Sequence, residues 1–134
     1  MRVLFVCAGN TCRSPFAEAV ARHEGHVDVE SAGLTAHAGD EPPDDATATA
    51  RELGLDLSSH RARPLTEKML QRADVIVAMT TAHVDALEGL GVRGKTRRLG
   101  GADVEDPLGG GRDAYRRAYA QIESDVRTFF RERQ

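Results

Sequence analysis

The sequence of 134 residues lacks the features that mark several large classes of protein. No apolar run approaches the ~20 residues of a membrane-spanning helix, and no signal peptide precedes the first apolar stretch. The net charge of −3 gives no basic excess of the kind that binds nucleic acids or anionic membranes. Internal repeats are absent. We therefore expect one domain over residues 1–134, a cytoplasmic monomer without nucleic-acid or membrane partners.

Cysteine is also scarce, and tryptophan is missing altogether. The two cysteines, Cys7 and Cys12, lie too close together to staple a fold, so in a reducing compartment they indicate chemistry rather than structure. No spacing typical of a metal site appears among the five histidines, which are His23, His26, His37, His60 and His83. We expect neither a metal site nor a cofactor.

The most informative stretch covers residues 2–15. An apolar, β-branched run from Val3 to Val6 predicts a buried strand that ends on Cys7. A serine and a proline soon afterwards open an amphipathic helix. Between strand and helix lies a short loop of small side chains, which begins with Ala8, Gly9, Asn10 and Thr11. Its backbone N–H groups can converge on one point, and the helix N-terminus adds partial positive charge there. The stretch therefore predicts an anion site.

Cys7 and Arg13 give this anion site a chemical function. A nearby cation and a helix N-terminus favour the thiolate form of a cysteine, which is its nucleophilic form. The planar guanidinium of Arg13 matches two oxygens of a tetrahedral oxyanion, and the Ser14 hydroxyl can donate to the Cys7 sulfur. Cys-x5-Arg can also arise from a buried cysteine and a surface arginine with no shared role. The preceding strand and the following helix favour a cradle for phosphate or another oxyanion.

Strands and helices alternate along the chain. Apolar and alternating runs predict strands over residues 3–6, 27–31, 74–79 and 96–99. Helical spacing predicts helices that end at Gly25 and Gly54, a short helix over 65–72, one over 82–90, and one from 112 to near the end. This order is typical of an α/β three-layer sandwich, with a central parallel sheet of four strands in the order 2-1-3-4 and helices on both faces. The Cys7 loop then leaves the carboxyl end of a central strand, where such folds bind ligands.

The segment VLFVCAGNTCRSPFAEA resembles the signature of the low-molecular-weight protein tyrosine phosphatases. The resemblance extends through SAG at 31–33, LTEKMLQRADVIVAMT at 65–80 and Asp106-Pro107. Within that family the chain is most similar to the bacterial protein arginine phosphatases. These carry threonine at the position of Thr11 and a DP-x-GG segment like the one from Asp106 to Gly110. The resemblance implies a cysteine-dependent hydrolase of phosphorylated proteins or peptides, with a phosphocysteine intermediate and the catalytic residues Cys7, Arg13 and Asp106. It assigns substrate binding to Ala8, Gly9, Asn10, Thr11, Cys12, Ser14 and Leu108.

The leaving group needs a proton, and Asp106 is the candidate donor. An Asp-Pro pair alone is most often a turn starter. Here it precedes a run of three glycines that can lie across the anion site, and it matches the position of the family's general acid. We expect in-line attack by Cys7 with proton donation by Asp106, followed by hydrolysis with water that the same carboxylate activates.

Thr11 and Leu108 bear on the choice of substrate. A small side chain with a hydroxyl accommodates a polar guanidinium, whereas a bulky aliphatic one favours a phenyl ring beside it. Leu108 stands where both branches of the family usually carry an aromatic residue, so it weakens the stacking wall of either pocket. We favour phosphoarginine as the substrate, with phosphotyrosine as the alternative.

Other functions fit the sequence less well. An arsenate reductase of this fold needs further cysteines downstream of Cys12, and none follows. A non-catalytic phosphate-binding module needs neither nucleophile nor acid, and both are present. Cys12 either fills space behind the loop or forms a reversible disulfide with Cys7 under oxidant. Four acidic residues either mark the start of the next helix or form a rim that favours cationic substrates; they are Asp40, Glu41, Asp44 and Asp45.

Overall fold

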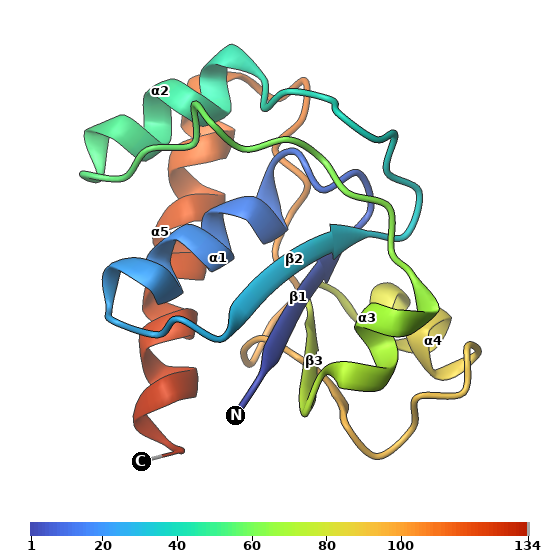
Figure 1. Cartoon of the computed structure of the whole chain (residues 1–134). Coiled ribbons are helices and arrows are strands. Elements are labelled where there is room, and N and C mark those ends of the chain that lie inside the picture. Colours follow the sequence, from blue (N-terminus) through green and yellow to red (C-terminus); the bar gives the residue numbers. More distant parts are fainter. Residues whose placement is uncertain (134) are drawn as a thin grey trace.

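The sheet has the four parallel strands, in the order that the sequence predicts. The computed structural model describes residues 1–133. Strand β1 (Val3–Cys7) lies between β2 (Val29–Gly33) and β3 (Val75–Ala78). Strand β4 (Thr96–Arg98) pairs with β3 at the edge, which gives the order β2-β1-β3-β4 (Figure 1). Parallel neighbours require crossover connections, and helices supply them.

Helices cover both faces of this sheet, which confirms the three-layer α/β sandwich (Figure 1). Within residues 1–133 there are five: α1 (Arg13–His23), α2 (Asp44–Glu52), α3 (Glu67–Arg72), α4 (Thr81–Glu88) and α5 (Gly111–Arg131). Helices α1, α2 and α5 pack on one face and α3 and α4 on the other. No helix in this range combines the length and the apolarity that crossing a bilayer requires.

The alternation of β1 divides the core between the two faces. Val3, Phe5 and Cys7 join the core under α1 and α5, whereas Leu4 and Val6 join the smaller core under α3 and α4. All five residues are buried, as expected for a central strand covered on both sides. Because side chains alternate along a strand, the same pattern directs the Cys7 sulfur toward α1.

The second strand begins and ends two residues later than the sequence predicts. Val27 is apolar but 77% exposed, and it precedes the strand. The strand instead continues through Gly33, which pairs with Cys7. A side chain at Gly33 would approach the Ala8 carbonyl oxygen to 2.5 Å, so this position requires glycine. The prediction of 27–31 followed local alternation and missed this close backbone contact beside the Cys7 loop.

Candidate active site

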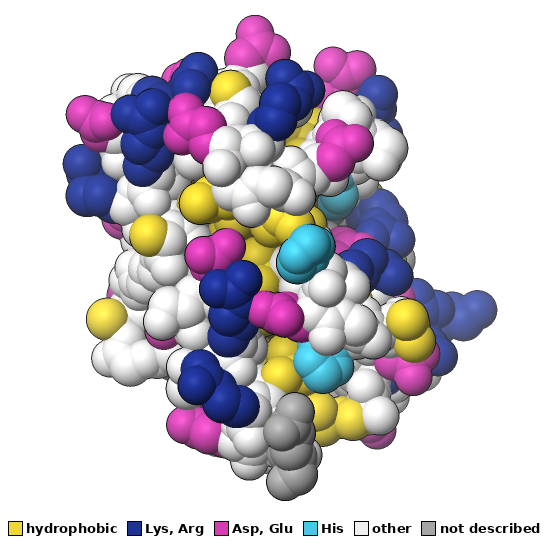
Figure 2. Space-filling view, turned by 90° about the vertical axis from the view of Figure 1, so that its left-hand side faces the viewer, with side chains coloured by type: hydrophobic (Ala, Val, Ile, Leu, Met, Phe, Trp, Pro, Cys, Tyr) yellow, Lys and Arg dark blue, Asp and Glu magenta, His cyan; other side chains and the backbone are white. Residues whose placement is uncertain are grey.

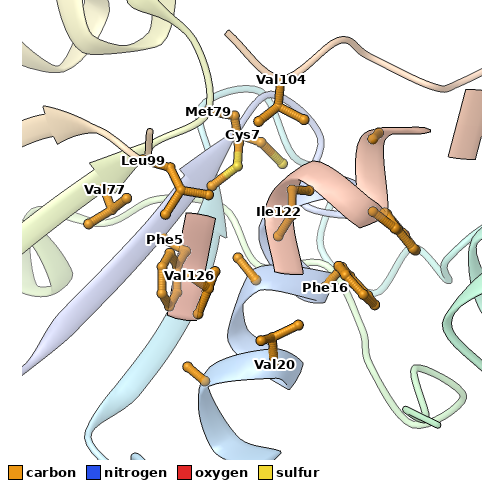
Figure 3. Packing of buried hydrophobic residues seen from close by; sticks show 14 of the residues in the cluster. Phe5, Cys7, Phe16, Val20, Val77, Met79, Leu99, Val104, Ile122 and Val126 are labelled. Atoms are coloured by element: carbon orange, nitrogen blue, oxygen red, sulfur yellow. The ribbon is translucent and has the colours of Figure 1, made fainter. Parts of the chain in front are cut away.

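Cys7 is the last residue of β1, and Ser14 lies in the first turn of α1. The two side chains meet, since the Cys7 sulfur is 2.9 Å from the Ser14 hydroxyl oxygen and both residues are buried. Figure 3 shows Cys7 at the end of its strand, with Met79 and Val104 beside it. The Cys7 loop (residues 7–14) thus places a thiol against the N-terminus of a helix, where negative charge is favoured.

Asn10 holds the Cys7 loop in shape. It is fully buried and has a left-handed backbone with φ of 55°, the one such non-glycine residue within 1–133. Its side-chain amide donates to the hydroxyls of Ser14 at 2.8 Å and Ser31 at 3.0 Å, and its side-chain oxygen accepts from the Arg63 N–H at 2.8 Å. The ring of His60 contacts its carbonyl oxygen at 2.8 Å. These contacts compensate for the unfavourable backbone conformation.

A buried carboxylate extends this network behind the loop. The Ser31 hydroxyl donates to Glu18 at 2.7 Å, and Glu18 also pairs with Arg22 at 3.0 Å and Arg63 at 3.5 Å. Glu18 was not among the predicted site residues. A sequence signal existed, because Glu18 follows Ser14 by four residues and therefore shares its face of the helix.

Arg13 links the Cys7 loop to the Asp106 loop (residues 104–110). It is buried, and its guanidinium donates to the Val104 carbonyl oxygen at 3.0 Å. A second nitrogen lies 3.9 Å from an Asp106 carboxylate oxygen. The Asp106 side chain is 56% exposed, and it accepts the Leu108 N–H at 3.1 Å in a tight turn. The structure therefore brings Cys7, Arg13 and Asp106 to one place.

Cys12 points into the core behind the loop. Its sulfur lies 3.3 Å from the Tyr115 hydroxyl, and the Tyr119 hydroxyl donates to its carbonyl oxygen at 2.8 Å. Burial raises the pKa of the Cys12 thiol, so this sulfur is held as a neutral thiol. Both cysteines are free in this structure. The two tyrosines are core residues, as the helical spacing of α5 predicts.

His83 lies near the site, although the sequence did not indicate it. Its backbone N–H is capped by the Thr80 hydroxyl at 3.1 Å, which fixes the start of α4. Its Nδ1 atom is buried without a hydrogen-bond partner among residues 1–133. Burial and the positive charge of Arg13 lower the pKa of His83, against the opposing effects of Asp103 and Asp106. A neutral imidazole thus stands within electrostatic range of Arg13 and Asp106.

The remaining predicted residues fall around this centre. Thr11 is partly buried, and its hydroxyl lies 3.7 Å from the Cys12 sulfur. Leu108 is 61% exposed on the Asp106 loop. Asp44 and Asp45 occupy the first turn of α2, which confirms that they mark a helix start. Within residues 1–133 no three potential ligand side chains are grouped as a metal site would require.

The fold and this loop define the class of the protein. The chain belongs to the family of low molecular weight phosphotyrosine protein phosphatases, whose profile matches residues 2–134. It is a cysteine-based protein phosphatase of that family.

Its relatives include enzymes of both specificities. The protein-arginine-phosphatase of Bacillus subtilis is 36% identical, over 95% of this chain and 93% of the relative. The low molecular weight protein-tyrosine-phosphatase Etp of Escherichia coli is also 36% identical, over 90% of this chain and 86% of the relative. Overall identity therefore does not distinguish the two substrates.

Two solved structures resemble this chain to a similar degree. The YwlE arginine phosphatase from Geobacillus stearothermophilus superposes with a TM-score of 0.91 at 33% identity, covering 98% of this chain and 91% of its own. Wzb of Vibrio vulnificus, in complex with benzylphosphonate, superposes with a TM-score of 0.92 at 30% identity, covering 98% and 97%.

Proposed function

We propose that this phosphatase hydrolyses phosphoarginine in proteins through a phosphocysteine intermediate on Cys7. Thr11 is the observation that carries the substrate assignment. Within residues 1–133 its hydroxyl makes only the 3.7 Å contact with the Cys12 sulfur, so it is free to accept another hydrogen bond. The N–H groups of a guanidinium supply that bond, whereas a phenyl ring has none to offer.

In the first step the Cys7 thiolate attacks the phosphorus in line with the leaving nitrogen. A sulfur–phosphorus bond forms and the phosphorus–nitrogen bond breaks, with its electron pair passing to the guanidino nitrogen. Asp106 gives that nitrogen a proton. Arg13 and the N–H groups of the Cys7 loop hold the phosphoryl oxygens, whose negative charge they stabilise. Ser14, 2.9 Å from the sulfur, donates to the thiolate.

In the second step water attacks the phosphorus of the intermediate. The Asp106 carboxylate takes a proton from that water, the sulfur–phosphorus bond breaks, and its electron pair returns to Cys7 as thiolate. The Ser14 hydroxyl stabilises the departing thiolate by the same hydrogen bond. The products are inorganic phosphate and an arginine side chain. Once it has given up its proton, the exposed Asp106 carboxylate offers a counter-charge to the guanidinium of the arginine product.

Phosphotyrosine is the second candidate substrate of the same site. The equal identity to Etp favours it, and the chemical steps are unchanged except that a phenolic oxygen takes the proton. Leu108 favours neither candidate, because an exposed aliphatic side chain provides no ring on which a substrate phenyl or guanidinium group could stack.

Steady-state kinetics on two peptides of one sequence, carrying phosphoarginine or phosphotyrosine, test this proposal. We expect kcat/KM to favour phosphoarginine in the wild type. Thr11→Ile should reduce kcat/KM for phosphoarginine by about 10–100-fold and leave the phosphotyrosine value within a few-fold. Thr128→Ile, the same change on the exposed face of α5, is the matched control. Equal losses on both peptides, or a wild-type preference for phosphotyrosine, would overturn the assignment.

Cys7→Ser tests the covalent route with the same peptides. It should abolish turnover of both substrates, because serine at this position is a far weaker nucleophile than a thiolate. Residual multiple turnover by folded Cys7→Ser protein would contradict a phosphocysteine intermediate.

A further inference from the structure

A second concave site lies outside the catalytic centre. It is a groove of about 730 Å³ between the outer face of α1 and the segment over residues 54–63, and we call it the α1 groove. Its lining includes none of Cys7, Arg13 and Asp106. Figure 2 faces this side of the molecule and shows apolar side chains exposed in a hollow, with histidine and charged side chains around it.

The floor of the α1 groove is apolar and its margin carries hydrogen-bond donors. The apolar lining consists of Pro15, Ala19, Leu55, Leu57 and Ala62. The charged lining residues are Arg22, Arg61, Arg63, Glu18 and Asp56, and Arg61 pairs with Glu41 beside the groove at 3.3 Å.

Arg22 and Arg63 share one carboxylate, Glu18, so this cluster of three side chains carries one positive charge in excess. Arg22 also donates to the Val29 carbonyl oxygen, and Arg61 to the carbonyl oxygens of Ser58 and His60. Ser31, Arg22 and Arg63 occupy the oxygens of Glu18, and the Ser58 N–H occupies Asp56 at 2.8 Å. The guanidinium of Arg63 makes only a 3.5 Å contact with Glu18 among residues 1–133. A guanidinium has five N–H donors, so Arg63 retains most of its capacity. At Arg63 the groove therefore complements a ligand group that brings acceptors and one negative charge.

We propose that the α1 groove binds a small amphiphilic carboxylate, with its apolar body on the floor and its carboxylate on Arg63. A flat apolar group removes the exposed floor from water, which is the main source of affinity. The carboxylate adds a charge-assisted hydrogen bond at the guanidinium of Arg63, whose side chain is 45% exposed. A single negative charge on the ligand balances the excess positive charge of the cluster formed by Arg22, Glu18 and Arg63.

The groove is connected to the catalytic loop through Asn10. Two residues of its lining contact Asn10 directly, since the Arg63 N–H donates to its side chain and the His60 ring contacts its carbonyl oxygen, both at 2.8 Å. A ligand that orders residues 60–63 stabilises the left-handed turn at Asn10 and with it the Cys7 loop. By reciprocity, an oxyanion in the Cys7 loop should tighten binding in the groove.

Amide NMR spectra of the full chain test the site, with 1-naphthoate as the probe and neutral 1-naphthalenemethanol as its matched control. Saturating inorganic phosphate occupies the Cys7 loop during the titration. We expect saturable shifts confined to α1 and residues 54–63, with naphthoate binding about 10-fold tighter than the alcohol. Shifts confined to the Cys7 loop, or equal affinities for the two probes, would overturn the proposal.

Variants separate the groove from non-specific binding. Arg63→Gln should remove the preference for naphthoate over the alcohol, and Ala19→Trp should fill the floor and abolish binding of both. Arg51→Gln, on α2 outside the groove, should change neither, and thermal melts show whether each variant is folded. Retained preference in Arg63→Gln would contradict the assignment. Omitting phosphate should weaken naphthoate binding several-fold; unchanged affinity would refute the connection to Asn10.

Discussion

The Cys7 loop and the Asp106 loop contribute to one proposed catalytic centre but are built in opposite ways. Asn10, Arg13 and Ser14 are buried. Asn10 and Arg13 make hydrogen bonds to other parts of the chain, and Ser14 bonds to Cys7 and Asn10 within the loop. On the Asp106 loop, Asp106 and Leu108 are more than half exposed, and the carboxylate is engaged by one backbone N–H and a distant guanidinium. The proposed phosphate cradle is thus preorganised before substrate arrives, while Asp106, the proposed proton donor, stands at the solvent boundary, where it can adapt to the leaving group.

Asp106→Asn should show the largest effect, because it removes the proton donor without touching the cradle. We expect kcat to fall by about 10²–10⁴-fold. The melting temperature and the affinity for inorganic phosphate should stay near the wild-type values, since the side chain is exposed. Steady-state kinetics together with phosphate titration by NMR measure both quantities. A comparable loss of phosphate affinity would mean that the two loops are not separable in this way.

Asn10→Ala should affect the cradle and cost stability instead. It leaves the Arg63 N–H without its partner and places alanine at a φ of 55°, so the free energy of unfolding should fall by about 2 kcal/mol. Asn10→Gly tolerates the left-handed backbone but still loses the side-chain hydrogen bonds. Its free energy of unfolding should therefore lie between those of the wild type and Asn10→Ala. Urea unfolding followed by far-UV circular dichroism suits a chain without tryptophan. Equal losses in both variants would show that backbone strain contributes nothing.

Some features of the site could be predicted from the sequence, and others depend on contacts between distant segments. The first strand and the placing of Cys7 beside the start of α1 follow from local patterns, namely an apolar run, a loop of small residues and a helix start. The anchoring of Asn10 does not, because its partners Ser31, His60 and Arg63 come from distant segments that no local period connects. For the same reason the burial of Glu18 and the α1 groove became visible only in the folded chain.

His60 makes the support of the cradle sensitive to pH. Burial lowers the pKa of this histidine below its ordinary value of 6.5, against the smaller effects of Asn10 and Glu18. The unfolded chain therefore binds a proton more readily than the folded one, and stability contributed by neutral His60 is lost as the pH falls below about 6.5. In His60→Gln the loss of unfolding free energy between pH 7.5 and pH 5.5 should be smaller than in the wild type. An equal loss in both proteins would contradict this assignment, since His83 and the other titrating groups are common to them.

Leu108→Phe should have the smallest effect and concerns the Asp106 loop alone. Because Leu108 is exposed, the substitution should change the free energy of unfolding by less than about 0.5 kcal/mol. A ring at this position can stack on a substrate phenyl group, so kcat/KM for a phosphotyrosine peptide should rise by about 2–10-fold. The value for the matched phosphoarginine peptide should change less, because its recognition depends on Thr11 and Asp106. Leu108→Met, which adds reach without a ring, is the control. If Leu108→Phe and Leu108→Met raise kcat/KM for both peptides equally, the side chain at position 108 acts by covering the site and does not select the substrate.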